Sequence, residues 1–537
     1  MISRLESPPL APAGNDECPK SELAEEISID AEGKDLEMGE TSTMAARESS
    51  VTGLSSTKFW MPMRGVPVHH LLHRGGQLLA SRGSFRASKP LEEQSLEMFI
   101  THSWNSSTWC KAVALASILN GWPAIVTSFS AQLVASVLVV AGKLPLIDVA
   151  HLSANEPRFS MWVLLAGTLT FWSCLYNFSE LRARLGCRLK YAFYDSACID
   201  QSNEEAKMKG ISQITAYLWH SNKLLILLSN NYFQRIWTVF ELAAFLALKP
   251  YSPVLVESLD LAGVTASASL AGLFFRPCWR VMRWYFADWR AHAGWGGDAA
   301  GSGLLALAAG VLGFGVLIMV FKLLRGWGIM RARLQEQIEN FTFAQARCSV
   351  ENDRVEILSA VHHLAEESQM VEPGASVEEA CAVLESRAKV LVPGCMLGAL
   401  STAGMPFKNA VMISLPRLMG ILDDQSSLCR EIWLTSPDPV PAILQMVLLT
   451  IALGFIALST LTVTLFITRQ KRQHCIMEVA ITFCCTGAAI AGSVLSRGPL
   501  ATLETPGLLN SAILVGISAI QGLLLWFCYG AGLPCRG

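Results

Sequence analysis

Long apolar runs alternate with polar stretches along the chain, and the apolar runs fall into two length classes. A run of about 20 apolar residues can cross a bilayer core as a helix, whereas a run of five or six between polar breaks favours a buried strand. The long runs predict six membrane spans, at Pro123–Val140, Met161–Tyr176, Leu304–Phe321, Ile443–Ile467, Ile476–Leu495 and Leu508–Tyr529. The short runs gather between Lys190 and Lys249, which we expect to be soluble.

Within Lys190–Lys249 the pattern predicts, in order, a strand, a polar loop, a helix, a second strand at Leu224–Ser229, a loop and a final helix. That final helix contains Glu241. Two further strands are predicted outside the region, at Phe99–His102 and Ser252–Glu257. Strand and helix signals therefore alternate, which is typical of an α/β domain.

Composition supports a membrane protein. The chain of 537 residues is 52% hydrophobic and only 16% charged, whereas soluble domains carry about 25% charged residues. The net charge of −2 argues against nucleic acid as a partner, because phosphate neutralisation needs a concentrated basic surface. The 15 cysteines are scattered and lack zinc spacing, so we interpret them as reduced thiols and expect no disulfide framework.

Charge distribution predicts the orientation in the membrane. The polar first fifty residues leave no cleavable signal peptide. Basic residues between Arg182 and Lys190 follow the second span, so the N-terminal tail and Lys190–Lys249 are expected in the cytosol. With six spans, 325–440 and its basic flank lie on the non-cytosolic side, which the positive-inside tendency disfavours. A seventh span near 258–275 would return that segment to the cytosol but place the basic cluster Arg469–Arg472 on the non-cytosolic side. We prefer six spans, although each count leaves one conflict.

The residues of the soluble region resemble a TIR (Toll/interleukin-1 receptor) domain. The resemblance rests on Phe193-Tyr194-Asp195, on the strand Leu224–Ser229, on Asn231-Tyr232 and on Trp237–Leu242, where Thr238 stands at the usual Cys. Phe99–His102 is similar to the first strand of the family, with Thr101 at its usual Ser. The longer string FITHSW, an apolar hairpin and YDSACIDQ resembles membrane-embedded TIR-like proteins of single-celled algae.

The resemblance implies a flavodoxin-like parallel sheet, and it leaves two arrangements of the first strand open. Either the apolar hairpin replaces the first helix of the fold, or the Phe99–His102 strand does not belong to the sheet.

The expected fold class is a multi-pass α-helical membrane protein with an inserted cytosolic α/β flavodoxin-like (TIR-like) domain. The expected division is a disordered acidic tail at 1–57, a basic membrane-proximal segment or flexible basic linker at 58–98, a first strand at 99–104, a transmembrane hairpin at 112–178, the TIR-like domain at 185–260, an interfacial aromatic and basic segment at 261–302, a span at 303–322, a mixed, mainly helical domain at 325–440 and three spans at 443–530.

Glu241 is the candidate catalytic residue. In catalytic TIR domains the matching Glu supports cleavage of the nicotinamide–ribose bond of NAD, so the resemblance implies NAD as a substrate, with Trp237, Tyr232 and Asp195 as binding residues. Helical spacing places Glu241 at the edge of an apolar stripe that includes Trp237, where its carboxylate would be partly desolvated. The alternative is a solvated Glu in a scaffold that only contacts other proteins.

No metal site is predicted. His69 and His73 have the i, i+4 spacing of a metal-binding helix, but His70 stands where a zinc protease places its Glu, and no further ligand follows.

Three functions remain open: a membrane-anchored TIR-like module for signalling or protein contact, an NAD glycohydrolase that uses Glu241, and a channel or transporter with a regulatory domain. The expected partners are the lipid bilayer and other TIR domains, including copies of this chain. A coupled transporter is disfavoured, because none of the expected spans has an Asp, Glu, Lys or Arg in its middle.

Overall fold

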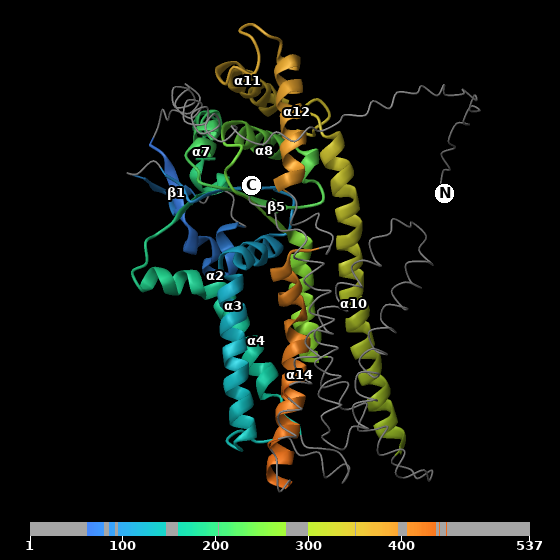
Figure 1. Ribbon diagram of the computed structural model, residues 1–537. Helices are drawn as coiled ribbons and strands as arrows, with labels where there is room; N and C mark the ends of the chain where they lie inside the picture. The colour runs from blue at the N-terminus through green and yellow to red at the C-terminus, as the bar shows by residue number, and fades with distance from the viewer. Residues whose placement is uncertain are drawn as a thin grey trace, which may run out of the picture. The chain divides into compact units, whose positions relative to one another are not determined.

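The computed structural model shown in Figure 1 describes residues 62–79, 85–91, 95–146, 159–201, 203–274, 299–348, 351–395 and 405–435, with positions 440 and 447. All of them belong to one compact unit, Gly53–Gly537. The expected acidic tail and, apart from Val447, the three expected C-terminal spans lie outside the described residues.

A mixed six-stranded sheet organises the described part of the chain. Its strands are β1 Arg64–Pro67, β2 Lys89–Pro90, β3 Met98–His102, β4 Tyr191–Phe193, β5 Leu224–Leu228 and β6 Val254–Ser258, in the order β2-β1-β4-β3-β5-β6. β3 pairs in parallel with both β4 and β5, and β6 pairs in parallel with β5. The antiparallel strands β1 and β2 extend the sheet beyond β4.

β3 is a central strand, although the whole apolar hairpin separates it from β4 in the sequence. Phe99 aligns with Phe193 on one side and with Leu224 on the other. The connection from β3 to β4 consists of α3 Thr108–Val140 and α4 Trp162–Arg184. The hairpin therefore takes the place of the first crossover helix, which is the first of the two arrangements that the sequence left open. Every residue of β3 and of β5 is buried, as expected for parallel strands covered on both faces.

Short helices connect the remaining strands. They are η2 Val68–Leu72, α2 His73–Gly76, η3 Gln77–Leu79, η4 Phe85–Ala87, α5 Asp195–Cys198, α6 Glu204–Ser212, α7 Ile214–Trp219, η5 Tyr232–Gln234, α8 Ile236–Leu248 and the helix Leu259–Phe274. α8 packs against β3 and α7. At its start Thr238 donates from Oγ1 to the carbonyl of Tyr232, so this side chain helps to fix the turn that follows β5.

The segment 325–440 contributes helices to two different places. These helices are α10 Ala299–Asn340, α11 Glu351–Glu367, α12 Val377–Cys395 and α14 Phe407–Thr435. α11 and α12 pack against α8, whereas α14 lies beside α3 and α4, as Figure 1 shows. α10 runs without a break from the expected span 303–322 into the segment that follows it.

One helix of the described residues, α3, is long and apolar enough to cross a membrane. α4 covers the second expected span but does not reach the same apolarity, because Trp, Ser and Asn interrupt its apolar residues. The expected span within α10 has most of its side chains outside the described residues. A multi-pass arrangement therefore stays a prediction.

Candidate functional site

The carboxyl ends of the parallel strands meet at one edge of the sheet. In open α/β sheets ligands bind outside this edge, where the strand order reverses. Here the reversal falls between β3 and β5, because the chain runs from β3 to β4 on one side and then returns to β5 on the other. The side chains gathered around this point come from five different elements: Thr101, His102, Lys111, Asp195, Tyr232 and Glu241.

Glu241 lies at the centre of this group and not at a solvated surface. Its side chain is buried, with 8% of the residue exposed, and burial raises the pKa of the carboxyl group to about 8. A hydrogen bond with Thr101 lowers this pKa and the nearby Asp195 raises it. Thr101 Oγ1 also lies 3.1 Å from the hydroxyl of Tyr232, which is fully buried. Glu241 is therefore largely protonated at neutral pH.

Asp195 is the second carboxyl of the site, at the first position after β4 and Tyr194. Burial raises its pKa to about 6, and the amide of Ser196, which donates to Oδ1 at 2.6 Å, lowers it. The positive charge of Lys111 and a hydrogen bond from Trp104 act in the same direction as that amide. Two neighbouring carboxyls with separated pKa values are typical of sites that use one as an acid and the other as an anion.

Lys111 connects this site to α3. It is the only charged residue of α3, it lies in the first turn, and it is buried. A lysine is rarely buried without an opposite charge, and the Asp195 carboxylate supplies that charge. The sequence prediction missed Lys111, although a single charge at the head of a long apolar run was a signal for it.

His102 closes the site on the side of β4. Its imidazole stacks on the Tyr194 ring with centroids 4.9 Å apart, and the Trp104 ring lies at 5.7 Å. Burial holds the pKa of His102 well below its usual value, so the ring is neutral. The adjacent Ser103 is fully buried, and its hydroxyl has no hydrogen-bond partner in the described part of the chain.

The structure brings together three of the four residues expected at the site and places the fourth elsewhere. Asp195, Tyr232 and Glu241 share the carboxyl edge. Trp237 instead donates from Nε1 to Asp353 of α11 at 3.3 Å. Its expected role in binding NAD stays a prediction.

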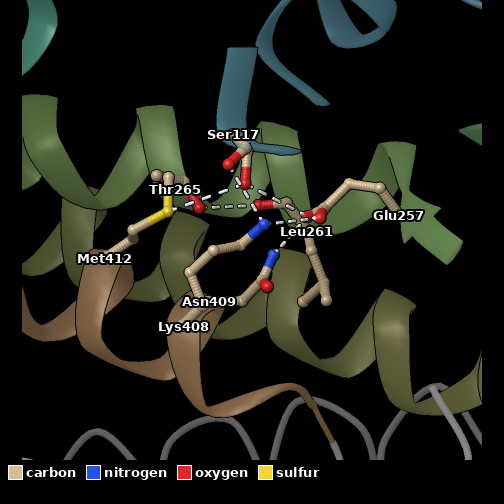
Figure 2. A network of polar contacts seen from close by, with 7 residues as sticks. All are labelled: Ser117, Glu257, Leu261, Thr265, Lys408, Asn409 and Met412. Carbon is tan, nitrogen blue, oxygen red and sulfur yellow. Dashed lines mark hydrogen bonds and ion pairs between the residues drawn. The ribbon is translucent and has the colours of Figure 1, made fainter. Parts of the chain in front are cut away.

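A second polar network joins the end of β6 to the helices (Figure 2). Glu257 of β6 accepts hydrogen bonds from Lys408 Nζ at 3.1 Å, from Asn409 Nδ2, and from Ser117 Oγ at 3.4 Å. Lys408 also donates to the Ser117 carbonyl at 3.1 Å. The network lies on α3, β6 and α14, so it connects the sheet to both helices. The sequence did not predict it, because its members are far apart along the chain.

Within the described ranges no group of three or more His, Cys, Asp or Glu side chains is arranged to hold a metal ion. Comparison of the chain with protein families, with curated proteins and with solved structures finds no match.

Proposed function

We propose that the chain is an integral membrane protein that carries a TIR-like domain for signalling through contact with other TIR-like domains. The observation that carries this proposal is the connection from β3 to β4. A helix long and apolar enough to cross a bilayer leaves the central strand of the sheet directly, and its first turn places Lys111 beside Asp195. A movement of α3 in the membrane would therefore displace Lys111 relative to Asp195 directly, with no other helix or strand between them.

The dimensions and surface of α3 support its place in the bilayer. A helix of 33 residues is about 50 Å long, whereas a bilayer core is about 30 Å thick. The last two thirds of α3 would cross the core, and the first turns would stand outside it. Large apolar side chains are exposed along that distal part, at Val126 (60%), Leu133 (59%) and Val137 (66%). A contiguous apolar surface of this kind marks contact with lipid or protein.

The test uses the full chain in vesicles, with donor and acceptor fluorescent proteins fused to separate copies. We expect the protein to resist extraction at alkaline pH, and energy transfer between copies to exceed that of an unrelated single-span protein at the same surface density. Release at alkaline pH would contradict the membrane part of the proposal. Transfer no greater than the control would contradict association between copies.

A second candidate, NAD glycohydrolysis, is favoured by the two carboxyls with different pKa values. In this reaction the bond between ribose C1′ and the nicotinamide nitrogen breaks, and its electron pair neutralises the positive ring. Water then adds to C1′ and releases a proton. The ionised Asp195 would stabilise the positive charge that develops on the ribose, and the protonated Glu241 would donate a hydrogen bond to a ribose hydroxyl.

Nicotinamide release by the full chain in detergent tests this candidate. We expect turnover by the native chain and a loss of about 10²-fold in Glu241→Ala. Glu180→Ala, which removes a carboxyl outside the site, is the matched control and should keep the native rate. Absence of turnover in the native chain, or equal rates in both variants, would remove the catalytic candidate.

A further inference from the structure

A cleft of about 750 Å³ lies between α2 and the C-terminal part of α4, away from the carboxyl edge of the sheet. It is lined by His69, His70, His73, Arg74, Gln77, Leu78, Glu180, Ala183, Arg184 and Leu189. Most of these side chains carry polar N–H groups. The cleft is therefore rich in hydrogen-bond donors.

The charges of the lining residues favour a singly charged anion. Arg74 and Arg184 contribute two positive charges and Glu180 one negative charge. Arg184 holds Glu180 at 2.6 Å, and His73 lies 3.6 Å from its second oxygen. Burial lowers the pKa of His69 and His70, so these rings are neutral donors. The lining thus carries a net charge of about +1 at neutral pH.

Arg74, which lines this cleft, has an unusual backbone conformation. Arg74 has φ of 50° and ψ of 44°, a left-handed conformation that is unfavourable for a residue with a side chain. The next two residues, Gly75 and Gly76, also have positive φ. Gly76 lies against α3, where an added Cβ would come within 2.6 Å of the Ala112 Cβ. No hydrogen bond or ion pair of the Arg74 side chain is present within the described residues. An arginine in a strained backbone conformation, with no side-chain partner among the described residues, is available to a ligand.

On α4, Glu180 lies at the depth of the headgroup layer of a bilayer, and Arg184 lies just beyond that layer, within the reach of its long side chain. Glu180 and Arg184 follow the expected end of the second span, Tyr176, by one to two helical turns, which is about 6–12 Å. Headgroups extend about 5–8 Å beyond each side of the hydrocarbon core. The same part of the chain exposes Leu181, Leu185 and Leu189 between arginines. Apolar and basic side chains interleaved in this way are typical of a membrane interface.

We propose that this cleft binds the phosphate of an anionic phospholipid, with Arg74 and Arg184 as its charged donors. The lipid as the source of the phosphate rests on the membrane part of the proposed function. The inference that the cleft binds a phosphate group is independent of the proposed function. Arg74 approaches the phosphate oxygens from the loop and Arg184 from the helix, and the neutral histidines donate from the cleft wall. Binding would anchor the α2 loop, and with it β1, to the bilayer surface.

Native mass spectrometry of the full chain from nonionic detergent tests the proposal, with phosphatidic acid, phosphatidylcholine and inorganic phosphate added separately. We expect phosphatidic acid to bind more tightly than phosphatidylcholine, and Arg74→Gln or Arg184→Gln to weaken its binding about tenfold. The matched control is Arg182→Gln, an exposed arginine of the same helix outside the cleft. Thermal unfolding of each variant shows whether the fold is kept.

Equal weakening by Arg182→Gln would overturn the site, because it would show diffuse attraction by surface charge. Equal binding of phosphatidylcholine and phosphatidic acid would overturn the preference for an anion. Inorganic phosphate that binds as tightly as phosphatidic acid would overturn the lipid as the ligand. Failure of the proposed function appears separately, as extraction of the chain at alkaline pH.

Discussion

Lys408 Nζ lies 3.1 Å from Glu257 Oε2, although the two residues are 151 positions apart in the sequence. Glu257 closes the parallel sheet near the end of β6, and Lys408 lies in the first turn of α14. The Glu257 side chain is 4% exposed, so this ion pair is shielded from water. The ion pair holds α14 against the sheet next to Ser117 of α3, which contacts both Glu257 and Lys408.

Breaking this pair should destabilise the protein. Lys408→Met keeps the aliphatic stem but leaves the Glu257 carboxylate buried without its counter-charge, which typically costs about 3–5 kcal/mol. Adding Glu257→Gln should recover part of that loss. Denaturant unfolding of the full chain in detergent gives the free energies. Lys143→Met, at an exposed lysine, is the control, and a Lys408 variant as stable as this control would contradict the prediction.

Stability should depend on pH through Glu241. Its pKa rises from 4.5 to about 8 on folding, so between these values the folded chain keeps a proton that the unfolded chain has lost. The free energy of unfolding therefore falls as pH rises through this window, with a slope of about 1.4 kcal/mol per pH unit. Glu241→Gln should remove this contribution. Unfolding curves at several pH values between 5 and 8 measure it, and parallel pH profiles for both proteins would contradict it.

The contact between Thr101 and Tyr232 should be worth about 1 kcal/mol. Both groups are buried and 3.1 Å apart, and a neutral hydrogen bond contributes about 0.5–1.5 kcal/mol. Thr101→Val leaves the Tyr232 hydroxyl unpaired, and Tyr232→Phe removes it. The double variant should therefore be more stable than the sum of the single losses predicts. Strict additivity in unfolding experiments would show that the two hydroxyls do not interact.

Gly167 of α4 should tolerate no side chain. An added Cβ would lie 2.8 Å from Gln132 Cγ of α3, and Gln132 is fully buried. Gly167→Ala should therefore cost about 1–3 kcal/mol by overpacking. Gly263→Ala is the matched change, because nothing lies within 4 Å of its Cβ position, and it should stabilise its helix by about 0.5–1 kcal/mol. Thermal unfolding compares the stability of the two variants. A higher unfolding temperature in both would show that α3 and α4 are not closely packed at Gly167.

The sequence predicted the buried parallel strands well, because strands covered on both faces are continuous apolar runs. It predicted β3, β5 and β6 within one or two residues, and it predicted that a helix containing Glu241 follows β5. β1 was not predicted, because four residues ending in Pro67 have no alternation that distinguishes a strand from a basic linker. Strands this short depend on their partner β4 for their conformation.

The candidate site was predicted only in part, for a different reason. The resemblance supplied Asp195, Tyr232 and Glu241, but it could not supply Lys111 or Glu257, whose roles depend on contacts between distant segments. Trp237 was also expected at the site from the resemblance, and it lies one helical turn before Glu241. In the structure the two residues have different neighbours. The Trp237 indole N–H donates to Asp353 of α11, whereas the Glu241 carboxyl group lies against β3.

The position of α3 and α4 between β3 and β4 has a consequence for biosynthesis. β3 leaves the ribosome before the hairpin, and all of its partner strands follow the hairpin. Both hydrogen-bonding edges of this central strand therefore stay unpaired until α3 and α4 have been made. Synthesis of the hairpin must therefore precede closure of the sheet. A defect in the folding of the hairpin would then leave both edges of β3 exposed, which favours misfolding and aggregation of the whole sheet.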